Sequence, residues 1–234
     1  MTTTTTNIHL IGGEKGGVGK SLVARILAQY MIDREIPFTG FDTDRSHGAL
    51  LRFYPEHSAP ALVEELSALD RIVEAAVDQP GRRVLVDLAA QTHDPLVRWM
   101  DDAGVVNLAD ELGVGMYYWH VMDSGKDSVD LLKKLLDRFG TGLRYVLVRN
   151  QVRGNDFALL EQSGEQARAQ KLGAKVVSVK RLHEHVINRI DSGNATFHTA
   201  KGSEREDNAL GLMDRQRVKM WLRDAYRELD DVGI

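Results

Sequence analysis

The hydrophobic and polar positions of this 234-residue chain follow two patterns that alternate from end to end. Short, continuous apolar runs that end on glycine or a carboxylate predict strands buried on both faces. Longer segments with apolar residues three and four positions apart predict helices between them. The predicted strands are Asn7–Gly12, Pro37–Asp42, Arg83–Leu88, Val114–Val121, Leu143–Val148 and Lys175–Val179. The predicted helices are Ser21–Arg34, Ala61–Asp78, Asp94–Leu112 (in two pieces that part near Gly104), Asp127–Phe139, Asp156–Leu172, His183–Ile190 and Leu210–Leu229.

This alternation predicts an α/β fold. Strands separated by helices of roughly 10–18 residues are typical of βαβ units, in which helices cover both faces of a mostly parallel, twisted sheet. No linker or repeat divides the chain, so we expect one three-layer domain over residues 7–234, preceded by a flexible tail over residues 1–6. The polar stretch Asp191–Asn208 is expected to be a loop.

The connection between the first strand and the first helix is rich in glycine and ends in Gly-Lys-Ser. Glycines let successive backbone N–H groups turn inward around an anion, and the helix that follows adds the positive end of its dipole. This context predicts a P-loop nucleotide site, in which Lys20 reaches the β- and γ-phosphates and the Ser21 hydroxyl binds Mg²⁺. The residues expected to hold the nucleotide are Gly13, Glu14, Lys15, Gly16, Gly17, Val18, Gly19, Lys20, Ser21 and Leu22.

A second lysine, Lys15, stands inside the loop and gives the form Lys-Gly-Gly-x-Gly-Lys-Ser. This form resembles the deviant Walker A box of the ParA/MinD class of P-loop ATPases. The resemblance implies that two subunits close face to face around ATP and that Lys15 reaches the nucleotide of the partner subunit. A cation supplied in this way acts like an arginine finger on the developing phosphate charge.

Two further segments resemble boxes of the same class. Phe41-Asp42-Thr43-Asp44 is similar to its switch I, which implies that Asp44 orients the attacking water and that Asp42 lies near the Mg²⁺ shell. Val84-Leu85-Val86-Asp87 is similar to its Walker B strand, with Asp87 bonded to a Mg²⁺ water. The chain departs from the class after both acids, because Arg45-Ser46 replaces Pro-Gln and Leu88 to Gln91 lack the usual prolines.

Base recognition rests on the asparagine that ends the strand run Tyr145 to Asn150. The resemblance implies that Asn150 hydrogen-bonds adenine. The alternative is that Asn150 is simply a turn residue, which is the commoner role of an asparagine after a strand.

Three phrases resemble the TraL family of conjugal-transfer ATPases, which is a relative of the ParA/MinD class. They are Ile8-His9-Leu10, Ser21–Ala24 together with Leu27–Tyr30, and Leu212–Lys219. The two resemblances imply a slow, partner-stimulated ATPase that positions or partitions DNA or a large cargo, or that acts in conjugal DNA transfer. Two alternatives stay open, a nucleotide-dependent adaptor that does not hydrolyse ATP and an ATP-dependent synthetase or amidoligase of the same fold.

Composition narrows the class further. The absence of cysteine excludes disulfides, thiolate metal sites and iron–sulfur clusters. The start of the chain lacks the basic and apolar regions of a signal peptide and no apolar run is long enough to span a bilayer, so we expect a cytoplasmic protein. The acidic end of the last helix argues against a membrane anchor, so its apolar face is expected to be core: Val218, Trp221, Leu222, Ala225 and Leu229.

The net charge of −4 is unevenly distributed. Residues 1–117 carry 10 basic and 17 acidic side chains, whereas residues 118–234 carry 20 and 17. The densest basic stretch is either a solvated face or, doubled on a dimer, a non-specific DNA contact that would associate the protein with the nucleoid. Its members are Arg168, Lys171, Lys175, Lys180, Arg181 and Arg189.

Overall fold

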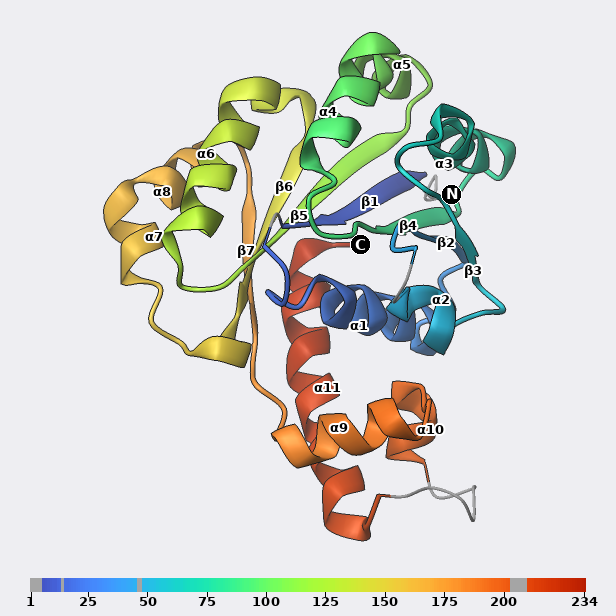
Figure 1. Cartoon of the computed structure of the whole chain (residues 1–234), viewed down its shortest axis with the longest axis vertical. Coiled ribbons are helices and arrows are strands. Elements are labelled where there is room, and N and C mark those ends of the chain that lie inside the picture. Colours follow the sequence, from blue (N-terminus) through green and yellow to red (C-terminus); the bar gives the residue numbers. More distant parts are fainter. Residues whose placement is uncertain (1–5, 14, 46–47, 203–209) are drawn as a thin grey trace.

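A wholly parallel, seven-stranded sheet lies at the centre of the computed structural model, which describes residues 6–13, 15–45, 48–202 and 210–234 (Figure 1). The strand order is β3-β2-β4-β1-β5-β6-β7, so β1 lies between β4 and β5. The strands are β1 (Asn7–Gly12), β2 (Phe38–Asp42), β3 (Ser58–Pro60), β4 (Arg83–Asp87), β5 (Gly115–Met122), β6 (Arg144–Asn150) and β7 (Lys175–Val179).

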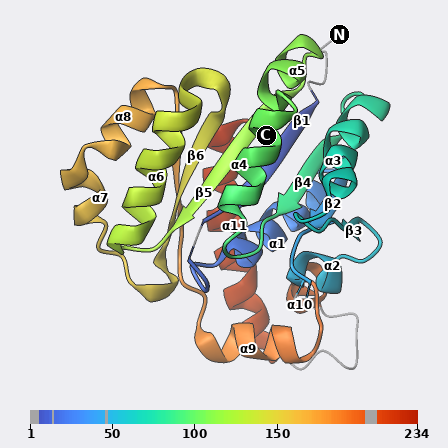
Figure 2. The ribbon, with the colours of Figure 1, turned by 45° about the horizontal axis from the view of Figure 1, so that its top comes forward.

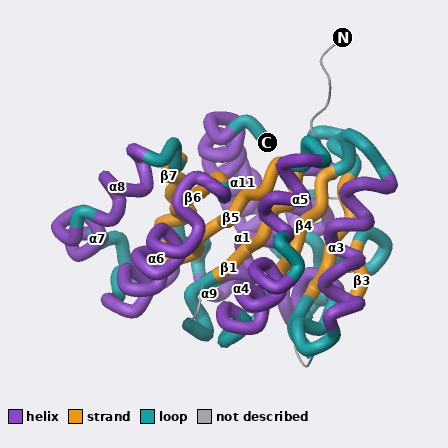
Figure 3. The backbone as a smooth tube through the Cα atoms, turned by 90° about the horizontal axis from the view of Figure 1, so that it is seen from above, coloured by secondary structure: helices purple, strands orange, loops and turns teal. Residues whose placement is uncertain are grey.

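Helices cover both faces of this sheet, and each face has its own cluster of buried apolar side chains. Figures 2 and 3 view the molecule from the face covered by α3 (Leu66–Asp78), α4 (His93–Asp102), α5 (Val105–Glu111), α6 (Lys126–Phe139), α7 (Ala158–Ser163) and α8 (Glu165–Lys171). The opposite face carries α1 (Lys20–Asp33), α2 (Ala49–Phe53), α9 (Glu184–Ser192), α10 (Phe197–Lys201) and α11 (Leu212–Val232). The predicted three-layer α/β fold is therefore confirmed.

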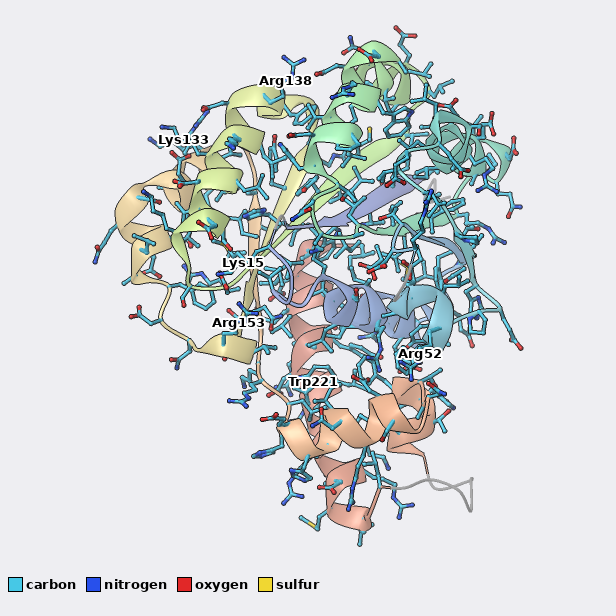
Figure 4. The ribbon with its side chains drawn as sticks, in the orientation of Figure 1. Lys15, Arg52, Lys133, Arg138, Arg153 and Trp221 are labelled. Carbon is cyan, nitrogen blue, oxygen red and sulfur yellow. The ribbon has the colours of Figure 1, made fainter. Side chains whose placement is uncertain are left out.

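The sequence patterns follow from this layering. Every residue of β1 and β4 is buried, because both strands lie inside the sheet with helices above and below, and this explains their continuous apolar runs. The predicted apolar face of α11 is buried in the core, and its Trp221 meets the ring of Phe197 edge-on at 5.2 Å between centroids (Figure 4). Only the side of a helix that faces the sheet needs apolar residues, so the spacing of three and four recurs there.

Five details differ from the sequence expectations. The helix expected from Ala61 begins at Leu66, and the helix expected over 156–172 is two helices that meet at Gly164, where φ is +78°. Part of the expected loop 191–208 is helical, because the Thr196 side chain accepts a hydrogen bond from the Thr199 N–H and starts α10; residues 203–209 lie outside the described part. The short elements α2 and β3 had no periodicity from which to predict them.

The fifth difference concerns Thr6, which the sequence placed in a flexible tail. Thr6 is buried, its hydroxyl oxygen accepts a hydrogen bond from Gly81 N–H, and its carbonyl accepts one from Gly115 N–H. These contacts hold Thr6 against Gly81 and Gly115, so Thr6 belongs to the folded domain. Residues 1–5 lie outside the described part.

Polar contacts tie the C-terminal helices to α1 and α2. The Arg25 guanidinium lies 2.8 Å from a carboxylate oxygen of Asp191 and 3.7 Å from the ring centroid of Phe53. Arg52, on α2, donates to the Asn194 side-chain oxygen at 2.6 Å and to the Asp191 carbonyl at 2.9 Å (Figure 4). The turn between α9 and α10 is thereby attached to two helices at the sheet.

In the part of the chain that the structure describes, no helix combines the length and the apolar character needed to cross a bilayer.

Two histidines are fully buried inside the molecule. His9 accepts a hydrogen bond from the Trp119 indole N–H, and His120 donates from Nε2 to the Ser128 carbonyl, so both rings are neutral. Burial, reinforced by the positive charge of Arg83, lowers the pKa of His9 to about 3. Burial likewise lowers the pKa of His120 to about 4, against the hydrogen bond to Ser128.

These two rings predict a loss of stability in mild acid. An unfolded histidine takes up a proton near pH 6.5, whereas the folded rings stay neutral down to about pH 4 for His120 and about pH 3 for His9. The unfolded state therefore binds more protons in this window. We expect each histidine to contribute a fall of about 1 kcal/mol per pH unit to the free energy of unfolding, measured in urea from pH 7.5 to pH 5. The raised pKa of Asp87 acts in the opposite direction, so the contribution of a histidine is read from its variant and not from the net slope. A His120→Gln variant should have a shallower slope than the wild type; equal slopes in the two proteins would contradict the assignment.

Candidate functional site

The predicted site residues lie together at the carboxyl-terminal ends of the strands. Parallel strands present their carboxyl ends on the same side, and ligands of such sheets bind beyond those ends. The glycine loop follows β1, Asp42 ends β2, Asp87 ends β4 and Asn150 ends β6. Asp123, which the sequence reasoning did not single out, follows β5 at the same edge.

The described part of the glycine loop is held against β6 by one side chain. The Asn150 amide donates to the Val18 carbonyl at 2.7 Å, and a Cβ at Gly19 would lie only 2.1 Å from the Asn150 amide nitrogen. Gly19 also has φ +94°, a conformation that side chains rarely adopt, so glycine is required there on two grounds. The loop then turns directly into α1 at Lys20, which puts the helix N-terminus next to the loop.

Lys20 and Lys15 lie on opposite sides of the loop. Lys20 is 7 % exposed, and its ammonium group donates to the Lys15 carbonyl at 3.3 Å. Lys15 is 39 % exposed and its ammonium group lies 3.4 Å from a carboxylate oxygen of Asp123. Counting back from Gly19, Lys20 and Ser21 puts the first glycine of the P-loop pattern at position 14, where this chain has glutamate, not at Gly13. Glu14 itself lies outside the described residues.

Asp42 and Asp87 are neighbours in the register between β2 and β4. The Asp87 carboxyl hydrogen-bonds the Ser21 hydroxyl, and burial together with the charge of Asp42 raises its pKa to about 8, against the opposing effects of Ser21 and Lys20. Both oxygens of Asp42 accept backbone N–H groups, from Asp44 and from Leu51, each at 3.0 Å. Burial still raises the pKa of Asp42.

The donor set of this corner fits a hard divalent cation. Asp87 Oδ1 is buried without a hydrogen-bond partner among the described residues, and the Ser21 hydroxyl and Asp42 lie beside it. Oxygen donors of this kind suit Mg²⁺, which binds through few protein ligands and keeps several waters. Among the described residues no group of three or more His, Cys, Asp or Glu side chains could hold a metal ion, so the two carboxyl groups and the hydroxyl of this corner would leave most positions around Mg²⁺ to water and phosphate.

Asp44 lies two residues after Asp42 and is half-buried, and its role in positioning water stays a prediction. The segment before it is anchored through Thr43. The Thr43 hydroxyl donates to the Asp87 carbonyl at 3.1 Å and accepts from the Ala89 N–H at 2.8 Å. The two loops that carry the candidate switch residues are therefore hydrogen-bonded to each other through Thr43, which the sequence reasoning missed.

Asp123, which follows β5, pairs with two basic side chains beside the loop. One of its oxygens accepts from Gly125 N–H and from the Ser128 hydroxyl, both at 3.0 Å. The other lies 3.4 Å from both Lys15 and Arg153, as Figure 4 lets the reader follow. Burial acts to raise the pKa of Asp123, but these hydrogen bonds hold it below its usual value. A strand next to β1 that ends on an acid was the sequence signal that could have predicted this residue.

A cavity of about 360 Å³ lies beyond the ends of β6 and β7, next to the loop. It is lined by Gln151, Val152, Arg153, Gly154, Asn155 and Arg181. Asn150 precedes this segment, but its side chain is 1 % exposed and faces the loop carbonyl. An adenine contact from its second amide hydrogen stays a prediction.

The six basic residues from Arg168 to Arg189 do not form one patch. Lys175 and Lys180 flank β7, whose length separates its two ends by about 17 Å. Arg168 pairs with Asp137 and Glu165, and Lys180 pairs with Asp224. The expected continuous stretch is therefore divided, because its residues lie at opposite ends of β7. Ion pairs also neutralise part of its charge.

Comparisons with known proteins agree with this geometry. No family model matches the chain. Protein MobD of Acidithiobacillus ferrooxidans is 24 % identical over 230 residues, covering 97 % of both chains, and a protein TraL of Escherichia coli is 25 % identical over 239 residues, covering 97 % of this chain and 98 % of that one. Among solved structures, a nucleotide-binding protein of Archaeoglobus fulgidus in complex with ADP superposes with a TM-score of 0.51 at 16 % identity, over 82 % of this chain and 88 % of that one. The chain has the P-loop NTPase fold.

The hydrogen bond from the Asn150 amide to the Val18 carbonyl, the clamp between β6 and the loop, should contribute to stability. In Asn150→Asp the side chain cannot donate to the Val18 carbonyl, and a carboxylate faces a buried carbonyl oxygen instead. Leaving such a group unsatisfied costs about 1–3 kcal/mol of the free energy of unfolding, which urea titration at pH 7.5 measures. The matched change at an exposed residue, Asn155→Asp, should leave the free energy of unfolding unchanged. Equal stability of both variants would show that the clamp contributes nothing.

Proposed function

We propose that this protein is an ATPase of the ParA/MinD class that uses Mg²⁺ and ATP as a dimerisation switch. The observation that carries the proposal is the corner where Ser21 and Lys20, at the start of α1, meet the buried Asp87 carboxyl. A buried carboxyl with an unpartnered oxygen beside a P-loop lysine is the arrangement that phosphoryl transfer requires for a metal-bound polyphosphate.

Each residue of the corner has a role in this proposal. Lys20 and the loop N–H groups bind the phosphates, whereas Ser21, Asp42 and Asp87 hold Mg²⁺ directly or through water. Mg²⁺ would neutralise charge on the phosphate oxygens. Asp44 orients the attacking water, and such positioning is the main task of the protein in phosphoryl transfer.

Lys15 is the residue that couples ATP to dimerisation. Its exposed side chain and its place at the rim of the loop support a role across a subunit interface, as the resemblance to the ParA/MinD class implies. ATP closes two subunits face to face, and hydrolysis, accelerated by a partner protein, reopens them. The similarity to MobD and TraL along nearly the whole chain supports a task in conjugal DNA transfer.

Three variants test the switch. Lys20→Ala should weaken ATP binding by about 100-fold, because it removes charged hydrogen bonds to two phosphates. Lys15→Ala should bind ATP but stay monomeric in light scattering, whereas the wild type with ATP and Mg²⁺ should be dimeric. Asp44→Ala should bind ATP and dimerise, yet turn ATP over about 100-fold more slowly, because the water loses its orientation.

The alternatives give different results in the same experiments. A wild-type chain that dimerises with ATP but releases no phosphate, alone or with its partner, would be the non-hydrolysing adaptor. A wild-type chain that stays monomeric with ATP and Mg²⁺ would contradict the switch and leave the synthetase or amidoligase alternative.

We also propose non-specific DNA contact through the basic residues at the carboxyl end of β7. Lys180, Arg181 and Arg189 follow β7, and α11 adds Arg217, Arg223 and Arg227. The acids paired with these six cations are Asp224, Glu184 and Asp214. Cations in excess over acids on one surface favour a polyanion.

The split of the basic stretch makes this test selective. The triple change Lys180→Ala, Arg181→Ala, Arg189→Ala should weaken retention on DNA in the presence of ATP about tenfold or more, with a smaller dependence on salt. The matched triple change Arg168→Ala, Lys171→Ala, Lys175→Ala should leave retention unchanged. Loss of retention in the second variant alone would refute this choice of surface.

A further inference from the structure

One buried carboxylate beside the glycine loop pairs with two partly exposed cations. Asp123 is 7 % exposed and is anchored through Oδ1 by Gly125 N–H and the Ser128 hydroxyl. Its Oδ2 lies 3.4 Å from Lys15 and from Arg153, whose side chains are 39 % and 47 % exposed. The carboxylate is therefore part of the framework, and the two cations are its loosely bound partners.

Arg153 reaches across the loop, and the loop is shaped to let it pass. Its Nη2 lies 2.6 Å from the position that a Cβ at Gly17 would occupy, and Gly17 has φ +76°. Arg153 ends the short helical turn Gln151–Arg153, which starts directly after Asn150. Because the Asn150 amide donates a hydrogen bond to the Val18 carbonyl, the backbone that carries Arg153 is held in place relative to the loop.

We propose that Arg153 is a phosphate-binding residue that acts within its own subunit, and that Asp123 holds Arg153 and Lys15 beside the loop until a nucleotide arrives. The inference rests on the proposed nucleotide site and adds a residue to it. The chemical class of the ligand is the polyphosphate chain of a nucleoside di- or triphosphate.

The weakness of their contacts with Asp123 favours a change of partner, in which Arg153 and Lys15 leave the carboxylate when phosphates arrive. Ion pairs of such exposed side chains are weak, and 3.4 Å is longer than the about 2.7–2.9 Å of a strong charge-assisted hydrogen bond. A polyphosphate offers more negative charge and several oxygens, which a planar guanidinium can bind with two parallel hydrogen bonds. Arg153 then stays with its own nucleotide, while Lys15 is released to reach across the interface.

Four variants of the full chain test this assignment by ADP and ATP affinity, with ADP isolating binding from dimerisation. Arg153→Ala should weaken both affinities about tenfold or more, and Arg153→Lys should restore part of the loss because it keeps the charge. Asp123→Asn keeps the Oδ1 anchor but removes the charge that competes with the phosphates, so its affinities should be equal to or higher than those of the wild type. Arg138→Ala is the matched control, because Arg138 lies on α6, is 55 % exposed and pairs with Asp101 far from the loop (Figure 4).

The loss of affinity expected for Arg153→Ala and the absence of a loss expected for Asp123→Asn separate binding from a structural role. If the cluster only braced the loop, both variants would lose affinity together, and that result would overturn the inference. ATP and ADP affinities of Arg153→Ala within twofold of the wild type would overturn it as well. If Arg153→Ala does not fold, Arg153→Lys and Asp123→Asn decide in the same way. A wild-type chain that binds neither nucleotide would instead refute the proposed nucleotide site itself.

Discussion

The parallel direction of all seven strands is the constraint on which the rest of the structure depends. It brings the carboxyl end of every strand to one edge of the sheet, and β1 lies in the middle of the strand order. The glycine loop therefore has the ends of β4 and β5 on its two sides. Residues that are 132 positions apart in the chain, Val18 and Asn150, become neighbours in this way.

The same constraint concentrates charge that the chain alone does not balance. The parallel register sets Asp42 beside Asp87, so two carboxyl groups are buried one strand spacing apart. Backbone N–H groups of α2, the Ser21 hydroxyl and Lys20 compensate part of this, but the pKa of Asp87 remains raised to about 8. On the other side of the loop the excess is positive, since Asp123 faces two cations. A ligand that brings a divalent cation at one end and phosphates at the other complements both imbalances.

Much of this architecture was predictable from the sequence, because long apolar patterns report on burial. Buried strands, amphipathic helices and the glycine loop with its lysine and serine all leave such patterns, and the acids that end β2 and β4 could be placed from the strands alone. The five-residue α2 and the three-residue β3 could not, because they are shorter than the stretches of about 11–18 residues for a helix and 4–8 residues for a strand over which a pattern can be recognised. Arg153 was missed for another reason: its significance is a contact with Asp123 between the ends of two strands, and no local sequence signal reports which strands are neighbours. For the basic stretch the sequence predicted one continuous surface, but residues that are close in sequence lie at opposite ends of β7.

The short helix α2 has a consequence beyond its size. In its first turn the backbone N–H of Leu51 donates a hydrogen bond to the Asp42 carboxylate. The next residue, Arg52, donates hydrogen bonds to the Asn194 side chain and to the Asp191 carbonyl, in the turn after α9. Asp191 is held in addition by Arg25 of α1. The carboxylate at the end of β2 and the turn between α9 and α10 are thus joined by one peptide unit and two side chains. A change at the Asp42 carboxylate therefore has a path of direct contacts, through α2 and Arg52, to the C-terminal helices on the same face of the sheet.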